Sequence, residues 1–203
     1  MLVDLTDDPL MQLLVDQARR ASSLGPGLAR VHRQVGAALA PVIAKHLRLT
    51  ETEIAHVQGR ATGVSIAAGD EPVIVAMLRA GLFLAEGMWE CFPAAALVLQ
   101  AGHGAPIVSI PSATGPLVIM DAVINSGKTL RELLSAQGLQ DGRKVVVATL
   151  VGFRPTMETL AVEYPAVEFV AARISDRSYV GKGSTDTGSR LFGTTGWAAE
   201  RSP

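Results

Sequence analysis

Charge is scarce in this sequence. Charged residues make up 18% of the 203 residues, and 18 Lys and Arg against 19 Asp and Glu leave a net charge of −1. A general nucleic-acid-binding protein needs a basic excess to meet phosphates, so this balance argues against that class. Hydrophobic residues, at 48% of the chain, are sufficient for a sizeable core in one domain.

Cysteine and long apolar runs are also nearly absent. Cys91 is the only cysteine, which excludes an internal disulfide and a metal site built from several cysteines, and indicates a reducing, cytoplasmic environment. The longest apolar run, 73–78, stops at Arg79, far short of the roughly 20 residues of a membrane-spanning helix. Residues 1–10 are acidic rather than basic, unlike a signal peptide. We therefore expect no membrane association.

Residues 1–70 are predicted to form a helical N-terminal region. Asp8-Pro9 is typical of a helix start, because the carboxylate caps backbone amides and proline fits the first turn. Gly25-Pro26 interrupts the pattern, and a second helix is predicted from about Leu28. Pro41 within that helix is expected to kink it.

From Pro72 onward, short apolar strands alternate with helices. Continuous apolar strands in this alternation indicate an α/β fold with a mostly parallel sheet flanked by helices, and ligands bind such sheets at the carboxyl ends of the strands. We predict a single domain over 1–203, with its α/β core at 72–172 and a C-terminal segment at 173–203. The predicted strands are 73–77, 96–99, 117–120, 144–151 and 167–171, and the predicted helices are 82–91, 129–137 and 156–163.

The segment 117–130 carries the strongest chemical signal: an apolar strand, Asp121 at its end, a short Asn-Ser-Gly loop and a helix. Amides at such a loop, with the hydroxyls of Ser126 and Thr129, form an anion site, and Asp121 can accept hydrogen bonds from sugar hydroxyls. A P-loop is excluded, because Ala122 stands where that motif needs glycine. An ordinary strand–loop–helix with Asp121 as a cap is the alternative interpretation.

This segment resembles the ribose-5-phosphate loop of type I phosphoribosyltransferases, and its single acidic residue is similar to the form found in uracil phosphoribosyltransferases. The segment 78–82, Leu-Arg-Ala-Gly-Leu, resembles the pyrophosphate loop of the same enzymes. The Arg79 guanidinium offers a fork of hydrogen-bond donors suited to phosphate. The alternative interpretation is that Arg79 is a solvated arginine at the start of a helix. Residues 179–194 match the family's C-terminal base-binding segment without a gap. The chain is identified as a divergent member of the uracil phosphoribosyltransferase family, with a C-terminal base-binding hood.

The resemblance implies that the chain transfers a phosphoribosyl group from phosphoribosyl pyrophosphate (PRPP) to uracil, giving UMP and pyrophosphate. The expected cofactor is Mg²⁺ carried with PRPP, without direct protein ligands. Arg79 would stabilise the leaving pyrophosphate, Asp121 would orient the ribose hydroxyls, and Asp186 would sit between base and ribose; these three are the expected catalytic residues. No dedicated general base is evident. The expected partners are small molecules and further copies of the chain, meeting through the helical N-terminal region.

The remaining site expectations come from the same resemblance. The expected PRPP-binding residues are Arg79, Asp121, Ala122, Val123, Ile124, Asn125, Ser126, Gly127, Lys128, Thr129 and Asp186, and the expected base-binding residues are Val180, Thr185, Asp186 and Thr187.

The sequence departs from the family at several of these places. Residues 100–103 stand where the uracil enzymes carry a second pyrophosphate-binding Arg, and His103 would replace it only when protonated. The stretch 104–115 is shorter than the family's flexible arm. Thr185 and Thr187 replace Gly and Ala where the base is read. A different acceptor base, or a non-catalytic nucleotide-binding regulatory protein, therefore stays open as an alternative.

Overall fold

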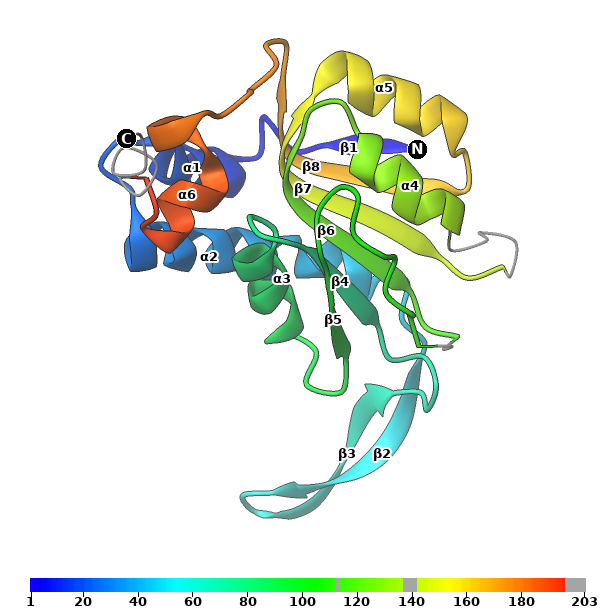
Figure 1. Ribbon diagram of the computed structural model, residues 1–203. Helices are drawn as coiled ribbons and strands as arrows, with labels where there is room; N and C mark the ends of the chain where they lie inside the picture. Colours follow the sequence, from blue (N-terminus) through cyan, green and yellow to red (C-terminus); the bar gives the residue numbers. More distant parts are fainter. Residues whose placement is uncertain (112–113, 137–141, 196–203) are drawn as a thin grey trace.

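The computed structural model describes residues 1–111, 114–136 and 142–195 (Figure 1). Its centre is a six-stranded sheet in the order β1-β8-β7-β6-β4-β5, in which all neighbouring strands run parallel. This confirms the predicted α/β class. Within the described residues, no helix is long and apolar enough to cross a membrane.

The sheet strands are β1 (Leu2–Asp4), β4 (Val73–Met77), β5 (Ala96–Gln100), β6 (Leu117–Ile124), β7 (Val145–Phe153) and β8 (Val167–Ser175). The helices are α1 (Pro9–Arg19), α2 (Gly25–Ala44), α3 (Leu82–Trp89), α4 (Lys128–Ala136), α5 (Arg154–Glu163), the 3-10 turn η1 (Gly183–Thr185) and α6 (Thr187–Phe192).

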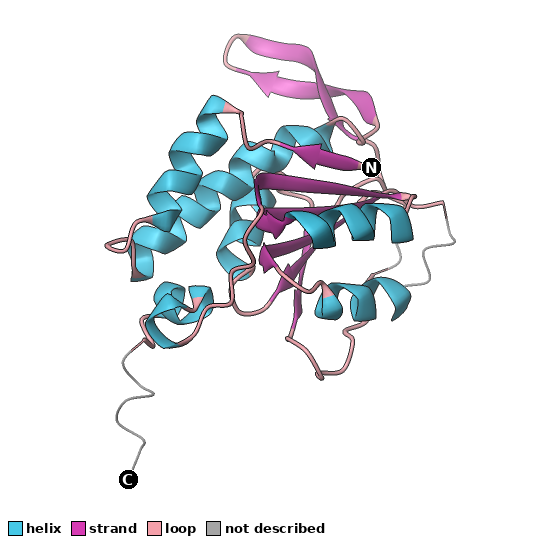
Figure 2. Ribbon diagram, turned by 90° about the horizontal axis from the view of Figure 1, so that it is seen from above, coloured by secondary structure: helices cyan, strands magenta, loops and turns pink. Residues whose placement is uncertain are grey.

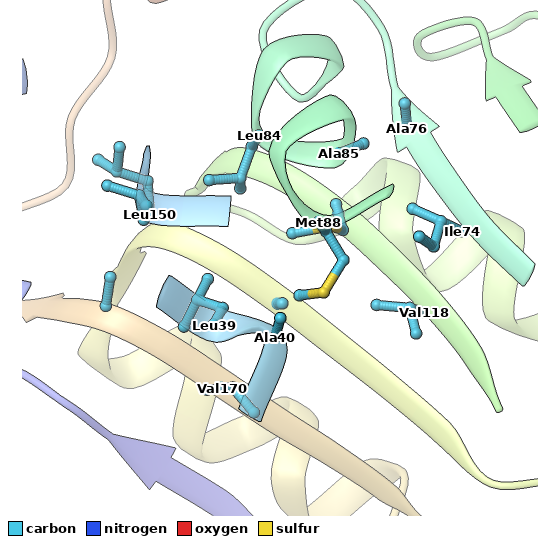
Figure 3. Close-up of a cluster of buried hydrophobic side chains, with 14 of the residues drawn as sticks. Leu39, Ala40, Ile74, Ala76, Leu84, Ala85, Met88, Val118, Leu150 and Val170 are labelled. Atoms are coloured by element: carbon cyan, nitrogen blue, oxygen red, sulfur yellow. The ribbon is translucent and has the colours of Figure 1, made fainter. Parts of the chain in front are cut away.

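Helices cover both faces of the sheet (Figure 2). On one face α1, α2 and α3 pack against alternate strand residues, where Leu39 and Met88 meet Ile74, Val118 and Val170 (Figure 3). On the other face lie α4 and α5. β4, β6, β7 and β8 are buried along most of their length and are largely apolar, as expected of strands covered on both faces, which explains why their positions were predictable from the sequence.

The predicted start of the first helix is confirmed. The Asp8 carboxylate accepts a hydrogen bond from the Met11 amide at 2.9 Å, and Pro9 is the first helical residue. The second helix begins at Gly25, earlier than predicted, and continues through Pro41.

The prediction of a helical region over 1–70 was wrong in two places. Leu2–Asp4 forms β1, the edge strand of the sheet. Residues 49–66 form an antiparallel hairpin of β2 (Leu49–His56) and β3 (Gly59–Ile66), paired along its full length. The hairpin projects away from the six-stranded sheet (Figure 1). Most of its side chains are exposed on both faces, and such a strand lacks the apolar alternation that marks a half-buried one.

Two strands run four residues further than predicted. β6 continues past Met120 to Ile124, and β8 continues to Ser175. In both cases apolar side chains near the strand end are buried, at Ala122, Ile124 and Ile174. Residues 122–124 therefore belong to the strand, and the loop after β6 begins at Asn125.

Helices α2 and α3 pack with their backbones in close contact. A Cβ on Gly36 would lie 2.0 Å from the Leu84 carbonyl oxygen, and one on Gly87 would lie 1.9 Å from the Arg33 carbonyl oxygen. A side chain at either position would force the helices apart. This contact fixes α3, and with it the loop that joins β4 to α3.

A buried carboxylate, that of Glu168, lies near the start of β8, at the opposite end of the strand from Ser175. Glu168 is 1% exposed and lies against two cations, Lys45 Nζ at 2.7 Å and Lys144 Nζ at 2.8 Å, and against the His46 imidazole, with Nε2 at 2.9 Å. Burial alone would raise the pKa of Glu168, but hydrogen bonds from Lys144 and Lys45 outweigh it and lower the pKa to about 2. The carboxylate joins the end of α2 to the sheet.

Candidate active site

The carboxyl ends of β4 and β6 bring two loops together. The two strands are neighbours, so the loop 79–81 after β4 lies beside Asp121. A Cβ on Gly81 would lie 2.4 Å from the Met120 carbonyl oxygen and 3.2 Å from the Asp121 Cα. Only glycine fits so close a contact. Gly81 thereby holds the loop that carries Arg79 against the strand that carries Asp121.

Asp121 is a partly buried carboxyl within β6. Burial raises its pKa to about 6, against hydrogen bonds from the backbone amides of Val123 and Ala122, which favour the ionised form. The group therefore changes charge near pH 6. Above its pKa it is a carboxylate that can accept hydrogen bonds from hydroxyl groups.

The loop 125–127 connects β6 to α4. Gly127 has a φ of 67°, a left-handed conformation that glycine adopts freely. Arg131 braces the loop: its Nη1 donates to the Ser126 carbonyl oxygen at 2.6 Å, while its Nε donates to Glu163 in α5 at 2.7 Å. A short, glycine-containing loop followed at once by a helix N-terminus is an arrangement that binds phosphates.

The first turn of α4 places Lys128 and Thr129 directly after this loop. Lys128 Nζ lies 3.0 Å from His103 Nε2, and His103 Nδ1 lies 3.1 Å from Glu132 Oε2. The structure thus brings His103 to the helix that follows the loop. Its service as a second pyrophosphate contact stays a prediction.

Gln100, at the end of β5, stands where the family pattern has a second arginine. Its side chain is buried: Oε1 accepts a hydrogen bond from the Val108 amide at 2.8 Å, and Nε2 donates to the carbonyl oxygens of Ala101 and Pro106 at 2.9 and 3.2 Å. Gln100 therefore organises the following loop and supplies no charge to the strand ends.

The C-terminal segment 176–195, which we call the hood, is tied to the loop after β6. The Tyr179 amide donates to Asn125 Oδ1 at 2.9 Å, and Asn125 Nδ2 donates to the Tyr179 carbonyl oxygen. In Figure 1 the hood leaves β8 in orange and crosses toward α1 and α2. The sequence pointed to Tyr179 only as the start of the matched 179–194 segment, so this contact was not foreseen.

The hood also reaches the loop after β4. Arg79 Nη2 lies 3.4 Å from Asp186 Oδ1 and 3.5 Å from Ser189 Oγ. The same Asp186 oxygen accepts a hydrogen bond from the Ser189 amide at 2.7 Å and so caps α6. A Cβ on Gly188 would lie 3.3 Å from the Arg79 guanidinium. Two of the three predicted catalytic residues are thus in contact, and the third lies beside the Arg79 loop.

A cavity of about 770 Å³, which we call the hood cavity, lies between the hood, α1, α2 and the ends of β6, β7 and β8. Val123 is the residue of β6 that lines the cavity, and none of the residues 125–129 is part of its lining.

The four predicted base-binding residues are placed differently. Thr185 and Thr187 line the hood cavity, whereas Val180 is exposed and Asp186 faces Arg79. The Thr185 hydroxyl is used within its own turn: it accepts from the Lys182 amide at 2.9 Å and donates to the Lys182 carbonyl oxygen at 3.0 Å. The added hydroxyl at this position therefore stabilises the hood turn.

Comparison with known proteins places this architecture. A family model described as uracil phosphoribosyltransferase matches residues 5–194. The chain is 29% identical to a uracil phosphoribosyltransferase of Pyrobaculum islandicum, over 96% of this chain and 100% of that protein. It is 25% identical to a uracil phosphoribosyltransferase of Staphylococcus carnosus, over 95% of this chain and 98% of that protein. The solved structure of the AQ2163 protein from Aquifex aeolicus superposes with a TM-score of 0.72 at 23% identity, covering 95% of this chain and 98% of that one.

The parallel sheet, the strand–Asp–loop–helix unit of β6 and α4, and the hood tied to both loops define a phosphoribosyltransferase of the type I fold. The family match then makes the assignment specific, because it extends over nearly the whole chain. The protein belongs to the uracil phosphoribosyltransferase family and is a pentosyltransferase that uses PRPP.

Proposed function

We propose that this chain transfers the phosphoribosyl group of PRPP to a ring nitrogen of uracil or a related pyrimidine. The bond between C1 of ribose and the diphosphate oxygen breaks, and pyrophosphate leaves with the electron pair. The bond between C1 and the ring nitrogen forms, and the nitrogen's proton passes to solvent. The observation that carries the proposal is the contact between Arg79 and Asp186, which brings the loop after β4 and the hood together beside Asp121.

Arg79 is the group we assign to the departing pyrophosphate. Its guanidinium is 54% exposed and contacts Asp186 and Ser189 at 3.4 and 3.5 Å, long contacts that leave donors for an incoming anion. Breaking the C1–O bond early gives an oxocarbenium-like transition state, in which charge grows on the leaving group. A fixed cation at that position lowers the barrier because it interacts most strongly once the charge has developed.

Asp121 and the loop 125–129 are assigned to the ribose 5-phosphate. The carboxylate accepts hydrogen bonds from the ribose hydroxyls, and the loop amides with the Ser126 and Thr129 hydroxyls bind the phosphate. Holding the sugar between these groups and the hood orients C1 toward the acceptor, which supplies rate through positioning.

The residues present fit a Mg²⁺ ion that arrives with PRPP. Mg²⁺ is commonly bound through substrate phosphates with only one or two carboxylates, and Asp121 supplies one carboxyl group within β6. Asp121, through the ribose hydroxyls, is the residue we assign to holding that complex. The bound ion would neutralise diphosphate charge.

Uracil specificity rests on the relatives, which are named uracil phosphoribosyltransferases. Two observations favour a related acceptor instead: Thr187 adds bulk to the wall of the hood cavity, and the cavity is large for a single ring. A regulatory protein without turnover is the other candidate, favoured by the uncharged, buried Gln100 at the end of β5.

Self-association through the hairpin 49–66 is a further part of the proposal. An isolated two-stranded hairpin is marginal in water, and this one exposes Ile54 and Val64 at 41% and 66%. A second copy of the chain would cover them. Light scattering should give the mass of a dimer or larger for the wild type and of a monomer for the double substitution Ile54→Lys, Val64→Lys; equal masses would contradict this surface.

The exposed Cys91 fits a reducing compartment, so we place the reaction in the cytoplasm.

The activity is tested by incubating the protein with PRPP, Mg²⁺ and single bases, and measuring pyrophosphate and nucleotide together. UMP formed in equal amount to pyrophosphate supports the proposal. Release with another ring, and none with uracil, identifies the altered acceptor. Tight binding of PRPP or UMP without release from any ring would show the regulatory alternative.

A further inference from the structure

The floor of the hood cavity crosses three strands. Val123 in β6 pairs with Val151 in β7, and Val151 pairs with Arg173 in β8, so the three residues form one row across the sheet. All three line the cavity. Adjacent strands lie about 4.8 Å apart, which places the Arg173 backbone roughly 10 Å from that of Val123. The floor is apolar at the β6 end and cationic at the β8 end.

Four arginines line this cavity, and the structure already occupies two of them. Arg190 Nη2 donates to three carbonyl oxygens around the end of α1, at 2.8 to 3.1 Å. Arg19 pairs with Asp16 at 2.9 Å. Arg173 and Arg177 have no side-chain hydrogen bond or ion pair within the described residues.

Arg173 is the more confined of these two. Its side chain is half-buried on β8; burial and then the nearby Arg19 lower its pKa, while Asp16 and Asp176 act in the opposite direction. Both carboxylates have cations of their own, Asp16 in Arg19 and Asp176 in Arg154. A desolvated guanidinium without a partner is costly, and an anion placed above Arg173 would remove that cost.

A second polar group in the cavity wall also lacks a partner. His32 of α2 is 1% exposed and lines the cavity, and its Nδ1 has no hydrogen-bond partner among the described residues. Burial, with a smaller contribution from Arg190, lowers the pKa of His32 to about 4. The imidazole is therefore neutral at pH 7, and it can donate to or accept from a ligand without adding charge. Buried polar groups in native proteins are nearly always paired.

The volume of the cavity exceeds the needs of a single small ring. Pockets of roughly 300–1,000 Å³ hold ligands of drug size, and the hood cavity has about 770 Å³. A ring next to Val123 and Thr187 would leave the part of the cavity over Val151 and Arg173 for something attached to it. That part offers a guanidinium and a neutral imidazole, which together suit a carboxylate.

Building on the proposed function, we propose that the acceptor of this chain is a pyrimidine ring that carries a carboxylate, which Arg173 binds. Arg173 is then a specificity-determining residue. The transfer itself is unchanged: the ring nitrogen attacks C1, pyrophosphate leaves, and the carboxylate is neither formed nor lost. Arg177, at the exposed edge of the cavity, adds positive charge on the path by which the acid enters.

The test compares uracil, uracil-5-carboxylate and uracil-6-carboxylate as acceptors with PRPP and Mg²⁺, for the wild type, Arg173→Met, Arg173→Lys and Arg30→Met. Arg30 is an exposed residue of α2 and is the matched control. We expect one acid to have a KM at least tenfold below that of uracil. Arg173→Met should raise the KM for that acid about ten- to a hundredfold, the worth of a hydrogen bond to a charged group, and leave the KM for uracil within about twofold.

A direct binding measurement keeps the inference testable if Arg173→Met does not fold. Calorimetry on the wild type should show the acid binding more tightly than uracil. In NMR spectra, the His32 ring nitrogen resonances should shift when the acid is added and not when uracil is added. Turnover of uracil with neither acid bound or used would overturn the inference and leave the proposed function intact. An equal effect of Arg173→Met on uracil and the acid would also overturn it. No transfer to any ring would overturn both.

Discussion

Asn125 holds Tyr179 through two hydrogen bonds, one from the Tyr179 amide to Oδ1 at 2.9 Å and one from Nδ2 to the Tyr179 carbonyl oxygen. Asn125 begins the loop assigned to the ribose phosphate, and Tyr179 begins the part of the hood assigned to the base. One side chain thus sets the position of one substrate site relative to the other.

Replacing Asn125 with Ala should weaken this link. Each hydrogen bond is worth about 1 kcal/mol net, so we expect kcat/KM for the acceptor to fall roughly tenfold or more. The Kd for PRPP should change less, because the loop backbone remains. Steady-state kinetics with varied acceptor, beside fluorescence or calorimetric titration of PRPP, measure the two effects. An equal loss for both substrates would contradict a role in placing the hood.

The activity should depend on pH through Asp121. Burial raises its pKa to about 6, so kcat/KM for PRPP should fall as the pH drops through about 6, where the carboxylate that accepts the ribose hydroxyls becomes protonated. Asp121→Asn should lower the activity and remove that acid limb. The free energy of unfolding separates this effect from denaturation. A carboxyl whose pKa is higher in the folded state than the unfolded value of 3.8 makes the fold more stable, not less, as the pH falls between those values.

Acid stability should depend on Glu168. Its pKa of about 2 lies below the ordinary 4.5, so its contribution to stability is fully present above 4.5 and is lost as the pH falls through 2. Glu168→Gln leaves Lys45 and Lys144 without their carboxylate and should lower the free energy of unfolding at pH 7 by about 3 kcal/mol. Urea titrations at pH values from about 2, the folded pKa of Glu168, up to neutral pH measure the free energy of unfolding of both proteins. A variant with unchanged stability at pH 7 would contradict it.

The contact between α2 and α3 should tolerate no side chain at Gly87. A Cβ there would lie 1.9 Å from the Arg33 carbonyl oxygen, and overpacking of this kind costs about 1–3 kcal/mol or more. Gly27→Ala is the matched control on α2, because its Cβ would meet nothing within 4 Å and alanine favours a helix by about 1 kcal/mol. Thermal unfolding should therefore show opposite shifts for the two variants; shifts of the same sign would contradict the packing.

The sequence predicts most of the sheet because β4, β6, β7 and β8 are largely apolar and buried along most of their length. The edge strand β1 was missed, because its three residues are too short for a pattern and are not buried. The Asp8 cap and the Arg79 and Asp121 loops are likewise local signals. The hairpin 49–66 was missed because neither of its faces is buried; Thr50, Thr52 and Ile54, with a two-residue turn at 57–58 followed by Gly59, are the signal that could have found it.

Long-range contacts are the part of the site that spacing does not reveal. Nothing in the sequence separation of Arg79 and Asp186 indicates that they meet, nor that Gly81 packs on Asp121. The register that aligns Val123 with Arg173 depends on β7 lying between them. These relationships arise from strand order, and strand order follows from how the whole chain packs.

The stabilisation of departing pyrophosphate by Arg79 is tested by counting both products of the reaction. Pyrophosphate and nucleotide are quantified in single assays with saturating PRPP, Mg²⁺ and the best acceptor, for the wild type, Arg79→Met and Arg30→Met. We expect equal amounts of both products from the wild type and from Arg30→Met, and a kcat for Arg79→Met lower by about 10²–10³, with its fold intact by circular dichroism. An undiminished kcat in Arg79→Met would contradict it.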